Sequence, residues 1–131
     1  VLTSSVAAIM GTPADKASCF DESDWNLSSQ AEGNPPGHGL DMYRYSKVVA
    51  EREAWRLAGL QQLEMASILP SFIVGPPRTP RTDSESLLNM RQALEGEVPP
   101  RGDTAMVDVR DVAAAHVAAA KIAGAAGHRF V

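Results

Sequence analysis

The sequence of 131 residues contains one cysteine, Cys19, and three histidines, His38, His116 and His128. A single cysteine cannot close an internal disulfide, and none of the histidines stands at a metal-ligand spacing from it. We therefore expect neither a disulfide scaffold nor a bound metal. The lone thiol favours a reduced, cytoplasmic setting.

Basic clusters and long apolar runs are missing as well. The 12 Lys and Arg residues are outnumbered by 16 Asp and Glu, for a formal net charge of -4, whereas nucleic acids and anionic membranes bind clustered basic residues. No apolar run of about 18 residues, the length that spans a bilayer, is present. We therefore expect no nucleic acid partner and no membrane association.

The residues that are present indicate one globular α/β domain. Hydrophobic residues make up 44% and charged residues 21% of the chain, which is ordinary for a folded domain. The two ends, "VLTSS" and "GHRFV", are apolar and strand-like, although domain termini are usually solvated. We expect the sequence to be a fragment of a longer protein.

Runs of apolar residues predict four strands. The first is residues 1–5, the second is 63–70 and ends in a proline, the third is 104–109, and the last is 127–131. Residues 71–82, rich in proline, are predicted as a loop. Near-continuous apolar strands are typical of a sheet that helices cover on both faces.

Helical periodicity appears between these strands. The clearest helix is 42–58, with Asp41 as N-cap and Gly59 as the residue after the C-cap. Further helices are predicted for 85–94 and 110–123. The alternation of strands and helices predicts a mainly parallel sheet with right-handed crossovers.

Residues 11–40 lose all periodicity and carry the Gly, Pro and Asn residues of a long irregular connection. Such connections are either binding loops or disordered segments, and we expect a binding loop here. We expect residues 1–131 to form a single unit, in which residues 21–40 and 76–103 contribute to binding a substrate.

The stretch "DMYRYSKVVAERE" at 41–53 places two tyrosines near a lysine. Residues four apart share a helix face, so Tyr43 neighbours Lys47, whereas Tyr45 has Val49 at that offset. An ammonium beside a phenol favours the phenolate, which suits a tyrosine for acid–base chemistry nearer neutral pH. The Y-x-x-x-K spacing alone is weak evidence, because exposed pairs at this offset commonly have no function.

Two serines, Ser4 and Ser5, end the first predicted strand. They fall at the carboxyl edge of a parallel sheet, where ligands bind in open α/β folds. A serine there can donate a hydrogen bond to a substrate oxygen and orient it toward the tyrosine. Alternatively, both hydroxyls cap the turn. The residues themselves leave both interpretations open.

Taken together, the motifs resemble the extended short-chain dehydrogenase/reductases, also described as the NAD-dependent epimerase/dehydratase family. Within that family, the sequence is most similar to dihydroflavonol reductases, cinnamoyl-CoA reductases and related carbonyl reductases. The resemblance extends over the whole chain in family order. The segments that carry it are "VLTSSVAAI", "DESDW", "YRYSKVVAEREAW", "ILPSFIVGPP" and "VDVRDVAAAHV".

The resemblance implies part of a Rossmann-like doubly wound parallel sheet and an NAD(P)H-dependent oxidoreductase that reduces the carbonyl of a ketone, aldehyde or acyl-CoA type substrate. It implies that Ser5 is the catalytic serine, that Tyr43 is the proton donor, and that Lys47 activates the tyrosine and binds the nicotinamide ribose. The implied cofactor contacts are Ser4, Tyr43 and Lys47, then Pro70, Ser71, Phe72 and Ile73 along the nicotinamide, and Ser86, which is expected to open the helix 85–94.

One departure from the family pattern concerns the cofactor phosphates. In the family, a glycine-rich turn and the helix after it hold the pyrophosphate, and no G-x-x-G-x-x-G occurs in this sequence. The residue that selects NAD or NADP lies beyond that turn. We expect NADP(H), with NAD(H) as the alternative, and we expect the isolated chain to be inactive.

Two other functions remain open at this point. A sugar-nucleotide epimerase or dehydratase would use the same Tyr43 and Lys47 for a transient oxidation. The isolated chain could instead be a non-catalytic fragment or an interaction module. The "VDVRDVAAAHV" and "DESDW" segments favour a reductase with a small-molecule carbonyl substrate.

Overall fold

The computed structural model describes residues 1–11, 19–80, 83–97 and 105–131. Short strands alternate with helices along the chain, as predicted. The elements are β1 (Leu2–Thr3), the short 3-10 helix η1 (Val6–Ala8), α1 (Gly39–Leu60), β2 (Ser67–Ile68), β3 (Phe72–Val74), α2 (Glu85–Leu94), β4 (Met106–Asp108), α3 (Val109–Lys121) and β5 (Arg129–Phe130).

The strands form two parallel sheets. β1 pairs with β2 and β2 pairs with β5, which gives the larger sheet the order β1-β2-β5, while β3 pairs with β4 in a separate ribbon. Helix α1 connects β1 to β2, and α3 connects β4 to β5. The predicted α/β class with a parallel sheet is confirmed.

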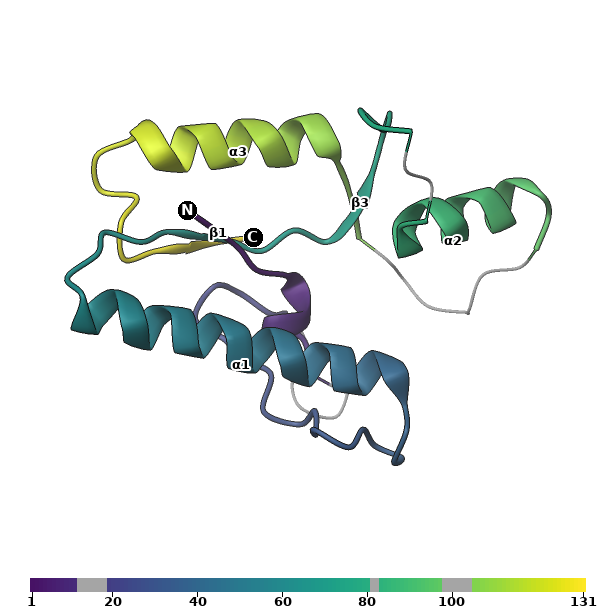
Figure 1. Cartoon of the computed structure of the whole chain (residues 1–131), viewed down its shortest axis with the longest axis horizontal. Helices are drawn as coiled ribbons and strands as arrows, with labels where there is room; N and C mark the ends of the chain where they lie inside the picture. Colours follow the sequence, from purple (N-terminus) through teal and green to yellow (C-terminus); the bar gives the residue numbers. More distant parts are fainter. Residues whose placement is uncertain (12–18, 81–82, 98–104) are drawn as a thin grey trace.

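The larger sheet lies between α1 on one side and α3 on the other (Figure 1). On the α1 side, Val48 packs with Ala8, Ile9 and Leu69 in the buried core. Helix α1 is thereby fixed both to the turn after β1 and to Leu69, directly after the central strand β2. Helix α2 stands apart from these layers, beside β3 (Figure 1).

The prediction of a loop over 71–82 is wrong for Phe72–Val74, which form β3. These three apolar residues pair in register with Met106–Asp108 of β4, and the prolines that suggested a loop lie outside the ladder. Gly75 ends the strand with a φ of 123°, and a Cβ there would approach Val109 to 3.0 Å. Residues 81–82, at the end of the predicted loop, lie outside the described residues.

The first helix starts earlier and ends later than predicted. The N-cap is His38, whose Nδ1 accepts the backbone N–H of Asp41 at 3.3 Å, so Asp41 as N-cap is wrong. The Asp41 carboxylate instead accepts the N–H of Gln30 at 3.0 Å and fastens the preceding loop. Gly59 lies inside the last turn, and the C-cap is Gln61.

The boundaries of the other elements also differ from the prediction. The N-cap of α2 is Ser84, whose Oγ accepts the N–H of Leu87 at 3.4 Å, so Ser86 lies within the first turn rather than opening the helix. Helix α3 begins at Val109, where a strand was predicted, because the side chain of Asp108 caps it. The N-cap side chains decide both helix starts.

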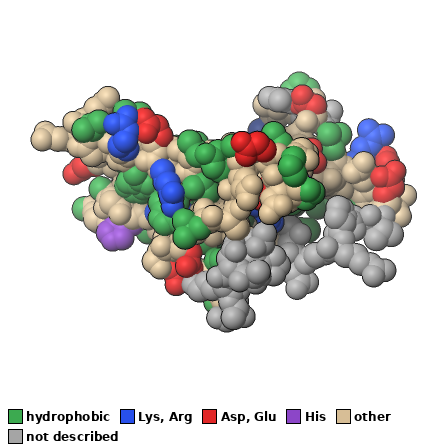
Figure 2. Space-filling view, turned by 90° about the horizontal axis from the view of Figure 1, so that it is seen from below, with side chains coloured by type: hydrophobic (Ala, Val, Ile, Leu, Met, Phe, Trp, Pro, Cys, Tyr) green, Lys and Arg blue, Asp and Glu red, His purple; other side chains and the backbone are tan. Residues whose placement is uncertain are grey.

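Figure 2 views the molecule from the side of α1 and the loop that precedes it, where hydrophobic side chains mix with acidic and basic ones. The outward side of α1 exposes Met42, Tyr45, Val49 and Leu57, with the ion pair of Arg56 and Glu53 on the same helix. In the described part of the chain, no helix combines the length and apolar character needed to cross a membrane.

Candidate active site

Residues 4–8, which run from the end of β1 through η1 and are called the Ser5 turn, lie beside the residues around Pro70 at the carboxyl edge of the larger sheet. The N–H of Ser4 donates to Ile68 O at 2.8 Å, and the N–H of Val6 donates to Pro70 O at 3.1 Å. The chain around Ser5 therefore runs alongside β2 up to its end. Two predicted site segments that are far apart in sequence are brought together.

The Ser5 hydroxyl caps η1, because its Oγ accepts the N–H of Ala7 at 3.2 Å. A hydroxyl that accepts one hydrogen bond keeps its own hydrogen to donate. Capping and the binding of a substrate oxygen are thus compatible, and the two interpretations of Ser5 from the sequence do not exclude each other.

An apolar groove of about 420 Å³ opens beside this edge. Its wall includes Val6, directly after Ser5, and the predicted cofactor contacts Pro70 and Ser71, and α3 supplies a further part of it. The predicted catalytic residues Ser5, Tyr43 and Lys47 are not among the residues that line it. The next two predicted contacts, Phe72 and Ile73, are held in β3, where Phe72 N–H donates to Ala105 O at 3.1 Å.

Helix α1, which carries Tyr43 and Lys47, packs on the turn after Ser5, because Val48 contacts Ala8 and Ile9 in the buried core. The Tyr43 side chain is 48% exposed, and Lys47 is half-buried. The tyrosine is therefore accessible to a ligand at this end of α1.

Two of the predicted cofactor contacts have other surroundings. Ser4 is buried, and its hydroxyl donates to Glu51 Oε2 at 2.7 Å. Ser86 lies in α2, which packs beside β3 and stands apart from α1 (Figure 1). The structure does not bring Ser86 next to the Ser5 turn.

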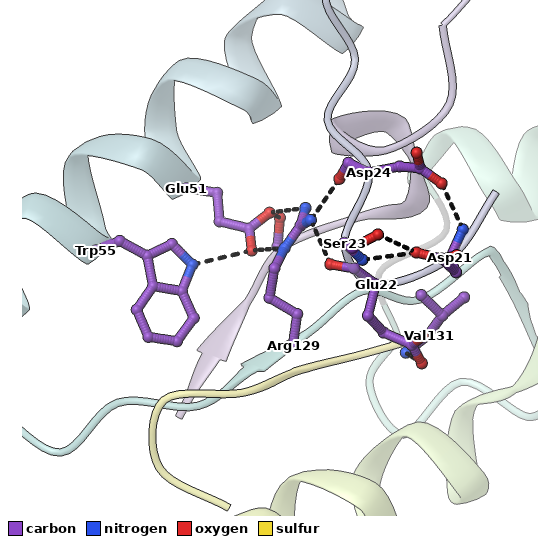
Figure 3. A network of polar contacts seen from close by, with 9 residues as sticks. Asp21, Glu22, Ser23, Asp24, Glu51, Trp55, Arg129 and Val131 are labelled. Atoms are coloured by element: carbon purple, nitrogen blue, oxygen red, sulfur yellow. Dashed lines mark hydrogen bonds and ion pairs between the residues drawn. The ribbon is translucent and has the colours of Figure 1, made fainter. Parts of the chain in front are cut away.

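Sequence reasoning missed a buried ion pair between α1 and β5. Glu51 and Trp55 project from α1 toward Arg129 (Figure 3), whose Nε lies 2.8 Å from Glu51 Oε1 and whose Nη2 lies 3.1 Å from Oε2. Trp55 Nε1 donates to Glu51 Oε1 at 3.2 Å. The spacing of four from Tyr43 through Lys47 to Glu51 places all three on one helical stripe, which pointed to Glu51 but not to its partner Arg129.

The ionisation of Glu51 is set by this pair. Burial alone would raise the pKa of the carboxyl, but the hydrogen bonds from Arg129 and Ser4 outweigh burial and hold that pKa below its usual range. A carboxylate that accepts several hydrogen bonds is favoured in its charged form. The cluster is therefore a true ion pair within the core.

The loop before α1 is fastened to the same region. Arg129 Nη1 donates to the carbonyl oxygen of Glu22 at 2.9 Å and also to that of Asp24, and its guanidinium lies 3.9 Å from the ring centroid of Trp25. Asn26 N–H donates to Ala8 O at 2.8 Å. Part of the predicted binding loop thus covers η1; residues 12–18 of it lie outside the described residues.

The groove fits one end of a dinucleotide better than the other. Its wall is almost entirely apolar, with Ser71 and Asp111 as its polar side chains. The uncharged dihydronicotinamide ring of a reduced cofactor suits such a wall, whereas the carboxylate of Asp111 would repel phosphate groups. The residues at this edge therefore fit the nicotinamide half of the cofactor.

Comparisons with known proteins identify the family. Residues 14–131 match the NAD dependent epimerase/dehydratase family. The chain belongs to this family.

The relatives it resembles include several reductases. The chain is 36% identical to tetraketide alpha-pyrone reductase 2 of Arabidopsis thaliana, over 97% of this chain and 39% of that protein. It is 33% identical to cinnamoyl-CoA reductase 1 of the same plant, over 97% of this chain and 36% of that protein. The chain thus spans less than half the length of these relatives.

A solved structure supports the same fold. Gre2 from Candida albicans in complex with NADPH superposes with a TM-score of 0.80 at 30% identity, over 97% of this chain and 40% of that one. The predicted Rossmann-like sheet is confirmed by this likeness.

Proposed function

We propose that the protein carrying this chain is an NAD(P)H-dependent oxidoreductase that reduces the carbonyl of a small ketone, aldehyde or acyl-CoA substrate. The observation that carries the proposal is the bond from Val6 N–H to Pro70 O at 3.1 Å. It holds Val6, the residue after Ser5, beside Pro70 in the wall of the apolar groove, and α1, which carries Tyr43 and Lys47, packs on η1. The relatives named above are themselves reductases.

In this proposal, Tyr43 donates the proton that the carbonyl oxygen requires. Its exposed position at the start of α1 leaves the phenol open to substrate. Lys47, one turn further along, offers a hydrogen-bond donor to a ribose hydroxyl. General acid catalysis of this kind contributes about 10²- to 10⁴-fold to the rate.

Ser5 holds the substrate oxygen, using the hydroxyl hydrogen that capping leaves available. Pro70 and Ser71 form the wall along the nicotinamide, and β3 fixes Phe72 and Ile73 behind them. A bound nicotinamide would supply the hydride. Because Gre2 from Candida albicans was solved with NADPH, we propose NADP(H) as the cofactor, with NAD(H) as the alternative.

The second candidate is a sugar-nucleotide epimerase or dehydratase, which the breadth of the matched family supports. To separate the two, the full-length protein is incubated with NADPH and a panel of aldehydes, ketones and acyl-CoA thioesters, and in parallel with UDP- and dTDP-sugars. The proposal predicts NADPH consumption with carbonyl compounds. Conversion of a sugar nucleotide without net cofactor consumption would overturn it in favour of the alternative.

A further inference from the structure

We propose that Glu51 and Arg129 are positioning residues. They fix the position of the Ser5 turn relative to α1, the helix that carries Tyr43 and Lys47. The inference rests on the proposed function, because it assigns the pair a task in the same reaction. Neither side chain needs to contact substrate for this task. The two residues act on Ser5 through the residues on either side of it.

The residue before Ser5 is held from α1. The Ser4 hydroxyl donates to Glu51 Oε2 at 2.7 Å, and both side chains are buried. Glu51 lies one turn after Lys47 on α1, so this bond ties the end of β1 to the helix that carries the tyrosine. A shift of α1 along the sheet would break it.

The residues after Ser5 are held through the loop. Arg129 fastens the loop by the carbonyl oxygens of Glu22 and Asp24 and by the face of Trp25. The loop in turn binds the η1 turn, because the Nδ2 of Asn26 donates to Met10 O at 2.9 Å and to Ala7 O at 3.2 Å. The Ser5 turn is therefore fixed on both flanks by a single charged cluster.

The chemistry of the pair supports a role in positioning the Ser5 turn rather than a role only in stabilising the core. Removing two charges from water is costly, and well-packed apolar residues often hold a core equally well. An ion pair adds a defined geometry, because its hydrogen bonds fix the directions in which both side chains point. Glu51 accepts bonds from Ser4, Trp55 and Arg129, and Arg129 reaches both the helix and the loop, so the cluster defines one relative placement of three segments.

The experiment is a double-mutant cycle on the full-length protein with NADPH and a carbonyl substrate. Glu51→Gln keeps the size of the side chain and removes its charge. The matched control is Glu53→Gln, an exposed carboxylate on the same helix that pairs with Arg56 at 2.6 Å. We expect Glu51→Gln to lower kcat by about 10- to 100-fold, since small misplacements of reacting groups cost this much, with little change in KM.

The cycle then repeats Glu51→Gln in a Ser5→Ala background. If Glu51 acts through Ser5, its loss should change kcat less than about twofold there, because effects that share one route are not additive. An equal loss in both backgrounds, or no loss with Ser5 present, would overturn the proposal. Unchanged turnover in Ser5→Ala alone would instead show that the proposed role of Ser5 fails, and the positioning role with it.

A milder variant covers the case in which Glu51→Gln does not fold. Ser4→Ala removes only the hydroxyl that links β1 to Glu51, and the same cycle with Ser5→Ala applies to it. Both tryptophans of the chain contact the cluster, so their emission reports on it directly. We expect an altered emission spectrum in Glu51→Gln and an unaltered one in Glu53→Gln; equal spectra in the wild type and Glu51→Gln would contradict the proposal.

Discussion

Arg129 and Glu51, 78 residues apart in sequence, meet as a two-pronged ion pair with their side chains 8% and 0% exposed. One residue belongs to the last strand and the other to the central turns of α1. The pair thus joins the last strand to the middle of α1. Its protonation links stability to pH.

Acid should weaken the fold through Glu51. Its pKa is lower in the folded chain than the usual 4.5, so its contribution to stability is complete above about pH 4.5 and is lost as the pH falls through the lowered value. In thermal unfolding of the full-length protein at neutral pH, the free energy of unfolding of the wild type should exceed that of Glu51→Gln by about 3 kcal/mol. The gap should close in acid; a gap independent of pH would contradict this account.

Ser67→Ala should keep or raise the stability of the protein. In the described part of the chain, the Ser67 hydroxyl is buried without a hydrogen-bond partner, and an unsatisfied buried hydroxyl costs about 1–3 kcal/mol. Alanine removes the oxygen and little else. The control is Ser4→Ala, which loses a bond of 2.7 Å to Glu51 and should lower the melting temperature. A large loss in Ser67→Ala would indicate a partner for that hydroxyl.

Gly33→Ala should destabilise the loop before α1. Gly33 has a φ of 79°, and a Cβ there would lie 2.8 Å from the backbone nitrogen of His38, so strain and a steric clash act together. We expect a loss of at least about 1 kcal/mol. Gly59→Ala is the control, because Gly59 lies inside α1 with open space around it. It should stabilise the helix by about 0.5–1 kcal/mol.

The 131-residue chain alone should bind a dinucleotide weakly. Pyrophosphate binds the backbone N–H groups of a glycine-rich turn at a helix N-terminus, and the sequence has no such turn. The groove beside Ser5 offers an apolar wall and the Asp111 carboxylate instead. Calorimetry with NADPH should detect no binding in the micromolar range, and tight binding would show that phosphate donors lie elsewhere in the chain.

Local sequence signals predicted much of this fold and part of the site. The periodicity of 42–58 and 110–123 is intrinsic to each segment, so α1 and α3 were predicted from it. Strand β3 was not, because three apolar residues gain their structure from pairing with β4. The N-cap of α1 was also misassigned, since Asp41 is an equally good cap by composition and tertiary contact with Gln30 decided against it.

The same limit applies to the candidate site. Tyr43 and Lys47 lie one turn apart, so a helical offset was enough to relate them. Glu51 and Arg129 become neighbours only when β5 joins β2 in the sheet, and no local pattern encodes that pairing. The contact of the Ser5 turn with Pro70 likewise depends on the order of the strands.

The most direct test of the central claim compares the turnover of Tyr43→Phe with that of Tyr45→Phe in the full-length protein. Phenylalanine keeps the ring at each position and removes only the hydroxyl, so both variants should fold. With NADPH and a carbonyl substrate, Tyr43→Phe should lose about 10²- to 10⁴-fold in kcat, the contribution of a general acid, while Tyr45→Phe stays close to wild type. Near-normal turnover in Tyr43→Phe would contradict the assignment of Tyr43 as the proton donor.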